Sequence, residues 1–225
     1  MNASGGQIVR VAIVDSGVHA AHPHVRGVAG GVAIDPDGRL SDDFVDRLGH
    51  GTAVTAVIRE KAPTAEILAV KVFDRELSTT VTALVAGIDW AIARGCALVN
   101  LSLGTSNPDH RAALEAAVSR ARVHAVSVVA AAPEAGIEWL PGSLPDVIAV
   151  EVDWTIDRDT CVVIEHGVST RIKASGYPRP IPGLSPEYNL KGLSFAVANV
   201  TGLLAAALDQ NRASINKIVK EWSIT

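Results

Sequence analysis

The chain has 225 residues, of which 48% are hydrophobic and 20% are charged, which suits one compact domain with a substantial core. We therefore expect a single domain over residues 1–225. Its 20 Lys and Arg residues against 24 Asp and Glu residues leave a net charge of -4 and form no basic run, which argues against nucleic acid as a partner.

The N-terminal stretch, residues 1–17, lacks the basic region, apolar segment and small-residue cleavage site of a secretion signal. No segment reaches about 18 uninterrupted apolar residues, so we expect neither a membrane span nor a membrane partner. Cys96 and Cys161 lie in apolar segments and make no disulfide framework, which indicates buried thiols in a reducing compartment. These features predict a soluble, cytoplasmic protein.

Apolar runs of strand length alternate along the chain with longer segments of helical periodicity. The expected elements are, in chain order, strand 9–15, helix 51–60, strand 65–73, helix 80–94, strand 97–103, helix 109–121, strands 125–132, 146–152 and 160–165, and helix 194–210. Most of the strands are continuously apolar, which is typical of a parallel sheet covered on both faces. The proline-rich stretch 177–186 predicts an ordered irregular loop. The order predicts an α/β fold, a three-layer sandwich with a mostly parallel doubly wound sheet.

Three polar residues stand at the expected boundaries of these elements. Asp15 ends the first strand, His50 lies between two glycines at a helix start, and Ser194 opens an apolar helix. Each has an ordinary explanation, since Asp is common in turns, Ser is a common helix N-cap, and a helix N-terminus disfavours a charged imidazole. Together they fall in the order Asp, His, Ser, which is one of the chain orders of the hydrolytic triad.

With these residues in place, the sequence resembles the subtilisin-like serine proteases along nearly the whole chain. The segments that carry the resemblance are AIVDSGVHAAHPHV (12–25), GHGTAV (49–54), KAPTAEILAVKVFD (61–74), GIDWAIARGCALVNLSLG (87–104), LPGSLPDVIAV (140–150) and GLSFAVANVTG (192–202). The resemblance implies the subtilisin-like fold and a catalytic triad. Ser194 would attack a peptide carbonyl, His50 would take the hydroxyl proton and pass it to the leaving amine, and Asp15 would hold the imidazole in the required tautomer.

The resemblance also implies a cleft for an extended peptide. Main-chain segments would flank the substrate as neighbouring strands, formed by Leu77, Ser78 and Thr79 on one side and by Ser102, Leu103 and Gly104 on the other. Val81 and Leu84 would line an apolar subsite or belong to the helix core. Trp139 stands where the family has a small residue near the base of the P1 pocket. It would favour a small P1 side chain, occlude the site until a partner or substrate moves the ring, or be ordinary core.

The chain departs from the family pattern around the oxyanion hole. Glu134 stands where the family has an asparagine whose amide donates to the oxyanion, and an ionised carboxylate has no proton to donate. Leu193 replaces a threonine before the nucleophile, and Ala198 replaces a proline after it. The Ser194 amide would still contribute to the oxyanion hole. A neutral Glu134 would also donate, if an apolar pocket raised its pKa.

Two segments bear on metals and maturation. Residues 56–63 pass directly from the expected helix to the next strand, without the calcium-binding insertion of secreted family members, so we expect no metal there, and no cofactor. The chain begins a few residues before its first expected strand. We therefore expect that an inhibitory pro-region either was removed or is not needed.

These observations predict a cytoplasmic serine endopeptidase with narrow specificity, such as the processing of a precursor peptide. Its partners would be a peptide or protein substrate and, in addition, a partner protein that completes or gates the site. The alternative is a pseudoprotease that binds peptides or a partner through the same cleft, which Glu134 and Leu193 favour and the retained triad opposes. A dinucleotide-binding protein is excluded because no glycine fingerprint follows the first strand.

Overall fold

The computed structural model describes residues 8–133, 136–165, 169–211 and 214–223. Within these residues, nine strands form one sheet in the order β3-β2-β4-β1-β5-β6-β7-β9-β8. Neighbouring strands are parallel except for the pairs at the two edges, β2 with β3 and β8 with β9. The strands are β1 (Arg10–Asp15), β2 (Gly30–Ile34), β3 (Leu40–Ser41), β4 (Glu66–Lys71), β5 (Leu98–Leu101), β6 (Ser127–Ala131), β7 (Val147–Val152), β8 (Cys161–Glu165) and β9 (Thr170–Ala174).

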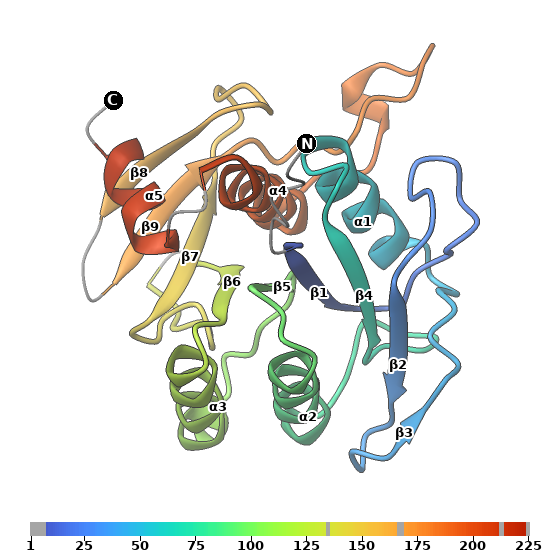
Figure 1. The fold of residues 1–225 in the computed structure, drawn as a ribbon, viewed down its shortest axis with the longest axis vertical. Coiled ribbons are helices and arrows are strands. Elements are labelled where there is room, and N and C mark those ends of the chain that lie inside the picture. The colour runs from blue at the N-terminus through green and yellow to red at the C-terminus, as the bar shows by residue number, and fades with distance from the viewer. Residues whose placement is uncertain (1–7, 134–135, 166–168, 212–213, 224–225) are drawn as a thin grey trace, which may run out of the picture.

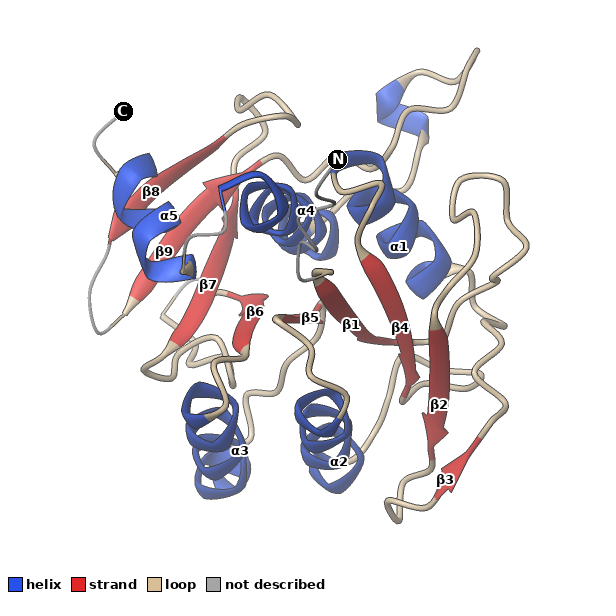
Figure 2. Ribbon diagram, viewed as in Figure 1, coloured by secondary structure: helices blue, strands red, loops and turns tan. Residues whose placement is uncertain are grey.

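Helices cover both faces of this sheet (Figures 1 and 2). On one face lie α1 (His50–Lys61), α4 (Leu193–Asn211) and α5 (Ile215–Trp222), and on the other lie α2 (Val81–Ala93) and α3 (Arg111–Val123). Side chains of β1 alternate between two buried clusters: Val11 and Ile13 pack with α1 and α4, whereas Ala12 and Val14 pack with α2 and α3. This double burial explains why the strand is continuously apolar, and it confirms the predicted three-layer fold.

Every strand and helix expected from the sequence is present, with ends shifted by a few residues. The elements that the sequence analysis missed are β2, β3, β9 and α5. β2 is short and starts with two glycines, and a Cβ on Gly31 would lie 2.6 Å from the Phe44 ring, so the strand carries little apolar periodicity. The last predicted strand, β8, is an edge strand in which Val162 and Ile164 are exposed, so its apolar composition does not reflect burial on both faces.

The central helix α4 is the most apolar long segment of the fold. Its window Leu193–Gln210 is long and apolar enough to satisfy the usual length and hydropathy criteria for a membrane span. In the structure, however, α4 packs against α1, β5, β6, β7 and β9, and 56% of that window is buried. Its composition therefore corresponds to that of a core helix in an α/β sandwich.

The two cysteines are free. Cys96 is buried and Cys161 is half-buried. Burial raises the pKa of the Cys96 thiol to about 12 and that of the Cys161 thiol to about 11. Both side chains therefore stay protonated near neutral pH, as expected of structural thiols.

A buried polar link joins the middle of the sheet to α4. Asn100 on β5 and Thr201 on α4 are both completely buried, and the Thr201 hydroxyl lies 3.0 Å from Asn100 Oδ1. The Asn100 amide donates to Ser102 Oγ at 2.9 Å. Because buried polar groups are costly when unpaired, this pairing fixes the height of α4 above the end of β5.

We expect Thr201→Val to lower the free energy of unfolding by about 1–3 kcal/mol, because valine keeps the shape but removes the hydroxyl that lies within hydrogen-bond distance of both the buried Asn100 Oδ1 and the Val197 carbonyl oxygen. Urea unfolding followed by circular dichroism measures the change. Thr82→Val is the matched control, since Thr82 is exposed on α2 and should change stability by less than about 0.5 kcal/mol. Equal effects of the two substitutions would show that the link contributes nothing.

Candidate active site

The carboxyl end of β1 and the first turn of α1 bring Asp15 and His50 together. His50 Nδ1 lies 2.7 Å from Asp15 Oδ1, and the Asp15 side chain is fully buried. The same carboxylate oxygen accepts a hydrogen bond from the Ser16 main-chain amide at 2.7 Å. This geometry assigns the Nδ1 proton to the contact with Asp15 and leaves Nε2 as the free basic nitrogen of a neutral ring.

Two opposing effects act on the His50 ring. Burial lowers its pKa, but the hydrogen bond and negative charge of Asp15, with a smaller contribution from Asp46, outweigh the burial. The pKa of His50 is therefore raised from its ordinary value of 6.5. The ring is therefore a stronger base than a free imidazole.

The glycines on either side of His50 have different roles. Gly49 adopts φ 83°, in the left-handed region that glycine tolerates best, and starts the helix. A Cβ on Gly51 would lie 2.2 Å from the Gly17 carbonyl oxygen and 3.2 Å from Asp15 Oδ1. Only a residue without a side chain lets α1 approach the end of β1 closely enough for the Asp15 contact.

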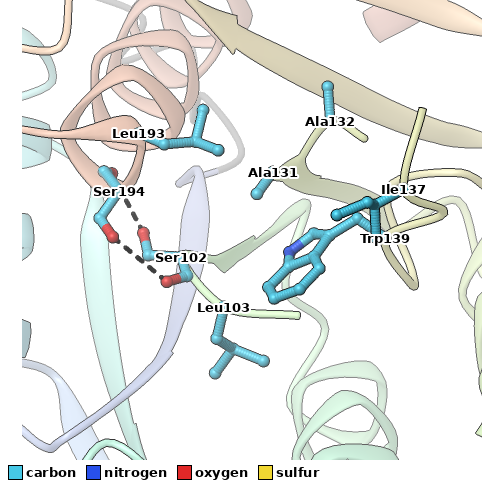
Figure 3. Close-up of a pocket in the computed structure, with 8 residues that line it drawn as sticks. All are labelled: Ser102, Leu103, Ala131, Ala132, Ile137, Trp139, Leu193 and Ser194. Atoms are coloured by element: carbon cyan, nitrogen blue, oxygen red, sulfur yellow. Dashed lines mark hydrogen bonds between the residues drawn. The ribbon is translucent and has the colours of Figure 1, made fainter. Parts of the chain in front are cut away.

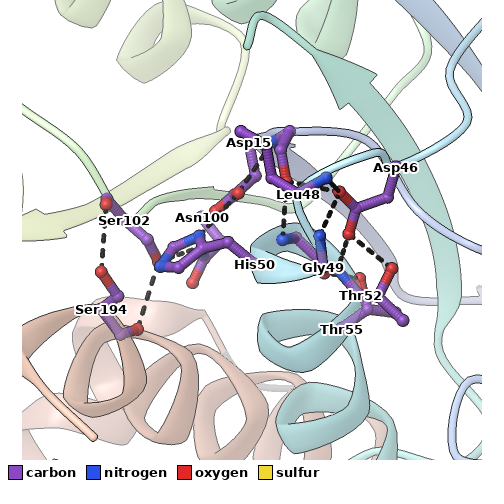
Figure 4. A network of polar contacts seen from close by, with 12 residues as sticks. Asp15, Asp46, Leu48, Gly49, His50, Thr52, Thr55, Asn100, Ser102 and Ser194 are labelled. Atoms are coloured by element: carbon purple, nitrogen blue, oxygen red, sulfur yellow. Dashed lines mark hydrogen bonds and ion pairs between the residues drawn. The ribbon is translucent and has the colours of Figure 1, made fainter. Parts of the chain in front are cut away.

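Gly49, the N-cap residue of α1, provides no side-chain cap, and side chains from outside the helix accept hydrogen bonds from its N-terminus instead (Figure 4). The Asp46 carboxylate accepts hydrogen bonds from the Leu48, Gly49 and Thr52 amides and from the Ser16 and Thr52 hydroxyls. Ser16 Oγ in turn accepts from the Gly51 amide at 2.9 Å. The network satisfies the otherwise unpaired N–H groups of the first helical turn and holds His50 in place.

Ser194 is the second residue of α4 and lines the same cleft as His50. Its hydroxyl donates to the Ser102 carbonyl oxygen at 3.3 Å, while the Ser102 hydroxyl donates to the Ser194 carbonyl oxygen at 3.2 Å. These bonds join the end of β5 to the start of α4 (Figure 4). Among the described residues, no hydrogen bond links the Ser194 hydroxyl to His50, so the structure shows the Asp15–His50 pair closed and the serine turned toward Ser102.

The predicted substrate-binding residues lie around one cleft of about 370 Å³, together with His50 and Ser194. They are Leu77, Ser78, Thr79, Ser102, Leu103, Gly104 and Trp139. Val81 and Leu84 line this cleft as well, and both also pack into the apolar cluster beneath α2. The two interpretations given for them from the sequence are therefore compatible.

A second cavity of about 330 Å³ opens beside Ser194 and is mainly apolar (Figure 3). Trp139 and Ile137 form one wall, Leu193 lies opposite them, and Leu103, Ala131 and Ala132 complete the lining. The loop that carries Trp139 is held by a two-way backbone bridge between Thr105 and Leu140. A Cβ on Gly104 would lie 2.1 Å from Trp139 Nε1, so the indole lies directly against this glycine. The ring narrows the cavity without filling it.

Several residues around the site were not identified from the sequence. Asp46, Ser16, Asn100 and Thr201 hold the elements that carry His50 and Ser194. A polar residue inside the apolar strand LVNL was a signal for Asn100 that the sequence analysis did not use. Glu134 lies outside the described residues, so its expected effect on the oxyanion stays a prediction. The link from α1 to β4, residues 62–65, is short, and among the described residues no cluster of side chains suits a metal ion.

Comparison with known proteins identifies the family of the chain and its fold. The profile of the subtilase family matches residues 6–151. A thermostable alkaline protease of Halalkalibacterium halodurans is 30% identical over 96% of this chain, which spans 61% of that protein's length. Subtilisin Savinase of Lederbergia lenta is 32% identical over 92% of this chain and 78% of its own. The crystal structure of a cold-adapted subtilisin-like serine proteinase superposes with a TM-score of 0.73 at 22% identity, covering 96% of this chain and 81% of that one.

The mostly parallel α/β sandwich is a fold of the subtilisin type. The chain belongs to the subtilase family.

We expect an NMR titration of the His50 Cε1 proton to give a pKa above 6.5 in the wild-type protein and a lower value in Asp15→Asn. The substitution removes the negative charge that stabilises the protonated ring, whereas burial continues to lower the pKa. Since the folded-state pKa is raised, the Asp15–His50 pair stabilises the fold fully below about pH 6.5 and loses this contribution as the pH rises through the raised pKa. His50→Gln assigns the resonance. An unchanged pKa in Asp15→Asn would contradict the assignment of its cause.

Proposed function

We propose that this protein is a serine endopeptidase that hydrolyses peptide bonds, with Ser194 as nucleophile, His50 as general base and acid, and Asp15 as the group that orients the imidazole. The observation that carries the proposal is the 2.7 Å contact between Asp15 and His50, which opens onto the same cleft as Ser194. The family of the chain supports the reaction type.

The reaction begins when the Ser194 hydroxyl turns from the Ser102 carbonyl toward His50 Nε2. The hydroxyl proton passes to Nε2 as the oxygen bonds to the peptide carbonyl carbon. When the C–N bond breaks, the proton passes from Nε2 to the leaving amine, and water then hydrolyses the acyl-enzyme by the same route in reverse. A loose serine contact before substrate binds is compatible with this role.

The start of α4 supports part of the oxyanion site. As the second residue of the helix, Ser194 has a main-chain N–H without an intrahelical acceptor, at the positive end of the helix dipole. This N–H would donate to the developing oxyanion, with no contribution from Leu193, whose side chain is apolar. Catalysis would therefore depend more heavily on substrate positioning in the cleft.

The apolar cavity beside Ser194 would bind the P1 side chain. Its lining lacks a charged residue among the described positions, and the Trp139 indole narrows it. We infer a preference for small to medium apolar P1 residues and hence a narrow specificity, such as the processing of a precursor peptide. The two free thiols, kept protonated by burial, support action in the reducing cytoplasm.

A second candidate function is binding without hydrolysis, in which the same cleft binds a peptide or a partner protein. One observation favours it: the Ser194 hydroxyl is engaged with Ser102 and not with His50.

Covalent labelling distinguishes the two functions. We expect a fluorophosphonate to label wild-type protein once, at Ser194, and to leave Ser194→Ala unlabelled. His50→Ala should label about 100- to 10,000-fold more slowly, because the general base is lost. Mass spectrometry of the labelled peptide identifies the site. Folded protein that stays unlabelled from pH 6 to 9 would leave only the binding function.

Replacing the pocket tryptophan tests the P1 assignment. We expect Trp139→Ala to raise the ratio of kcat/KM for a Phe peptide over an Ala peptide at P1 by about tenfold or more, because the cavity widens. Trp154→Ala is the matched control, since Trp154 is partly exposed, packs on Tyr177 and does not line the cavity. If the ratio changes equally in both variants, the indole does not bound the P1 subsite.

A further inference from the structure

A third cavity, of about 310 Å³, lies beyond His50 and shares no residue with the two already described. Figure 4 shows Ser102 and Ser194 on one side of the His50 ring and Asp46, Gly49 and Thr52, which line this cavity, on the other. Its remaining walls come from the turn after β1, from α1 and from the loop before Ser194. They comprise His19, His22, His24, Ala53, Ala56, Pro178, Arg179, Ile181, Asn189 and Leu190.

The position of this cavity indicates which part of a substrate reaches it. In the proposed reaction His50 gives its proton to the leaving amine, so the segment on the C-terminal side of the scissile bond passes His50. The opposite side of the cleft is formed by Ser102–Gly104 and the P1 cavity. The third cavity therefore lies on the path of the leaving segment. Leu190, four residues before Ser194, forms part of its wall.

Unpaired hydrogen-bond donors gather in this cavity. His22 Nδ1 accepts from the His24 main-chain amide, but among the described residues the other ring nitrogens of His19, His22 and His24 have no hydrogen-bond partner. The Arg179 guanidinium likewise donates no hydrogen bond, and its ion pair with Glu60 is long, with 3.8 Å between Nε and the carboxylate oxygen. The two histidine pairs, His19–His22 and His22–His24, meet edge to face.

The carboxylates nearby are already occupied. Asp46 accepts five hydrogen bonds from the α1 N-terminus and Ser16. Glu60 forms a short ion pair with Arg158 through one oxygen, and within the described part of the chain its other oxygen forms only the long ion pair with Arg179. The free capacity of the cavity thus belongs to donors and to the positive charge of Arg179. Burial, followed by the charge of Arg179, lowers the pKa of His24, which agrees with positive surroundings.

We propose that this cavity is a leaving-side subsite that binds an acidic side chain, with glutamate preferred, in the peptide segment after the scissile bond. This inference rests on the proposed function. Arg179 pairs with the carboxylate, and His22 and His24 donate hydrogen bonds to it. Pro178, Ile181 and Leu190 form an aliphatic wall that contacts the methylene groups of glutamate, which aspartate is too short to supply in full.

The experiment uses internally quenched peptides that differ only by Glu, Gln or Lys at each of the first three positions after the scissile bond. We expect a preference for Glu over Gln of about tenfold in kcat/KM at one of these positions. Arg179→Gln should remove this preference, Arg179→Lys should retain part of it, and Arg179→Glu should reverse it in favour of Lys. Arg39→Gln is the matched control, because Arg39 is an exposed arginine that does not line the cavity.

A peptidyl coumarin amide, which has no residue after the scissile bond, tests the proposed function separately. If it is hydrolysed while the Glu, Gln and Lys peptides react equally, the subsite is overturned and the endopeptidase function stands. If no substrate is hydrolysed, fluorescence anisotropy of the labelled Glu and Gln peptides decides the subsite. Tighter binding of the Glu peptide that Arg179→Gln abolishes supports it, and equal affinities overturn it.

Discussion

The site depends on how closely α1 approaches the carboxyl end of β1. The approach is possible because Gly51 has no side chain, since a Cβ there would overlap the Gly17 carbonyl oxygen. It brings His50 within 2.7 Å of Asp15, a carboxylate removed from solvent. In that environment the hydrogen bond and charge of Asp15, with a smaller contribution from Asp46, raise the pKa of the His50 ring against its burial. Asp46 completes the arrangement by pairing the donors of the helix start.

The serine side of the site has buried contacts of its own with the sheet. Ser194 stands at the start of α4, and its height above the sheet follows from buried contacts between α4 and β5. Asn100 and Thr201 connect the two elements through side chains, and Ser102 connects them again at the cleft. Ser194 and His50 therefore stand at the starts of two helices, α4 and α1, that pack against each other in one apolar cluster.

The cleft has a different chemistry on each side of His50. Toward the end of β5, the walls are main chain and apolar side chains, with Trp139 against Gly104. Beyond His50, the walls carry hydrogen-bond donors from the turn after β1 and from the loop before Ser194. An extended peptide spanning both sides would be recognised by shape on one side and by charge on the other. Two criteria combined in this way would give a narrow substrate range, because a peptide would have to satisfy both.

Much of the fold and of the candidate site could be predicted from the sequence, because hydrophobic periodicity depends only on residues close together in the chain. Continuous apolar runs predicted a sheet covered on both faces, and Asp15, His50 and Ser194 were recognisable because they follow a known chain order within segments that resemble the subtilisin-like proteases. β2 and β9 were missed because they are short and their patterns are weak.

Only the tertiary structure decided the contacts that depend on the distance between elements. It paired the Ser194 hydroxyl with Ser102 and the Ser16 hydroxyl with Asp46. It also brought the histidines of the turn after β1 to Arg179, which lies more than 150 residues further along the chain. A sequence pattern records which face of an element is buried, but it does not record how near two elements come or which polar groups remain unpaired once they have met.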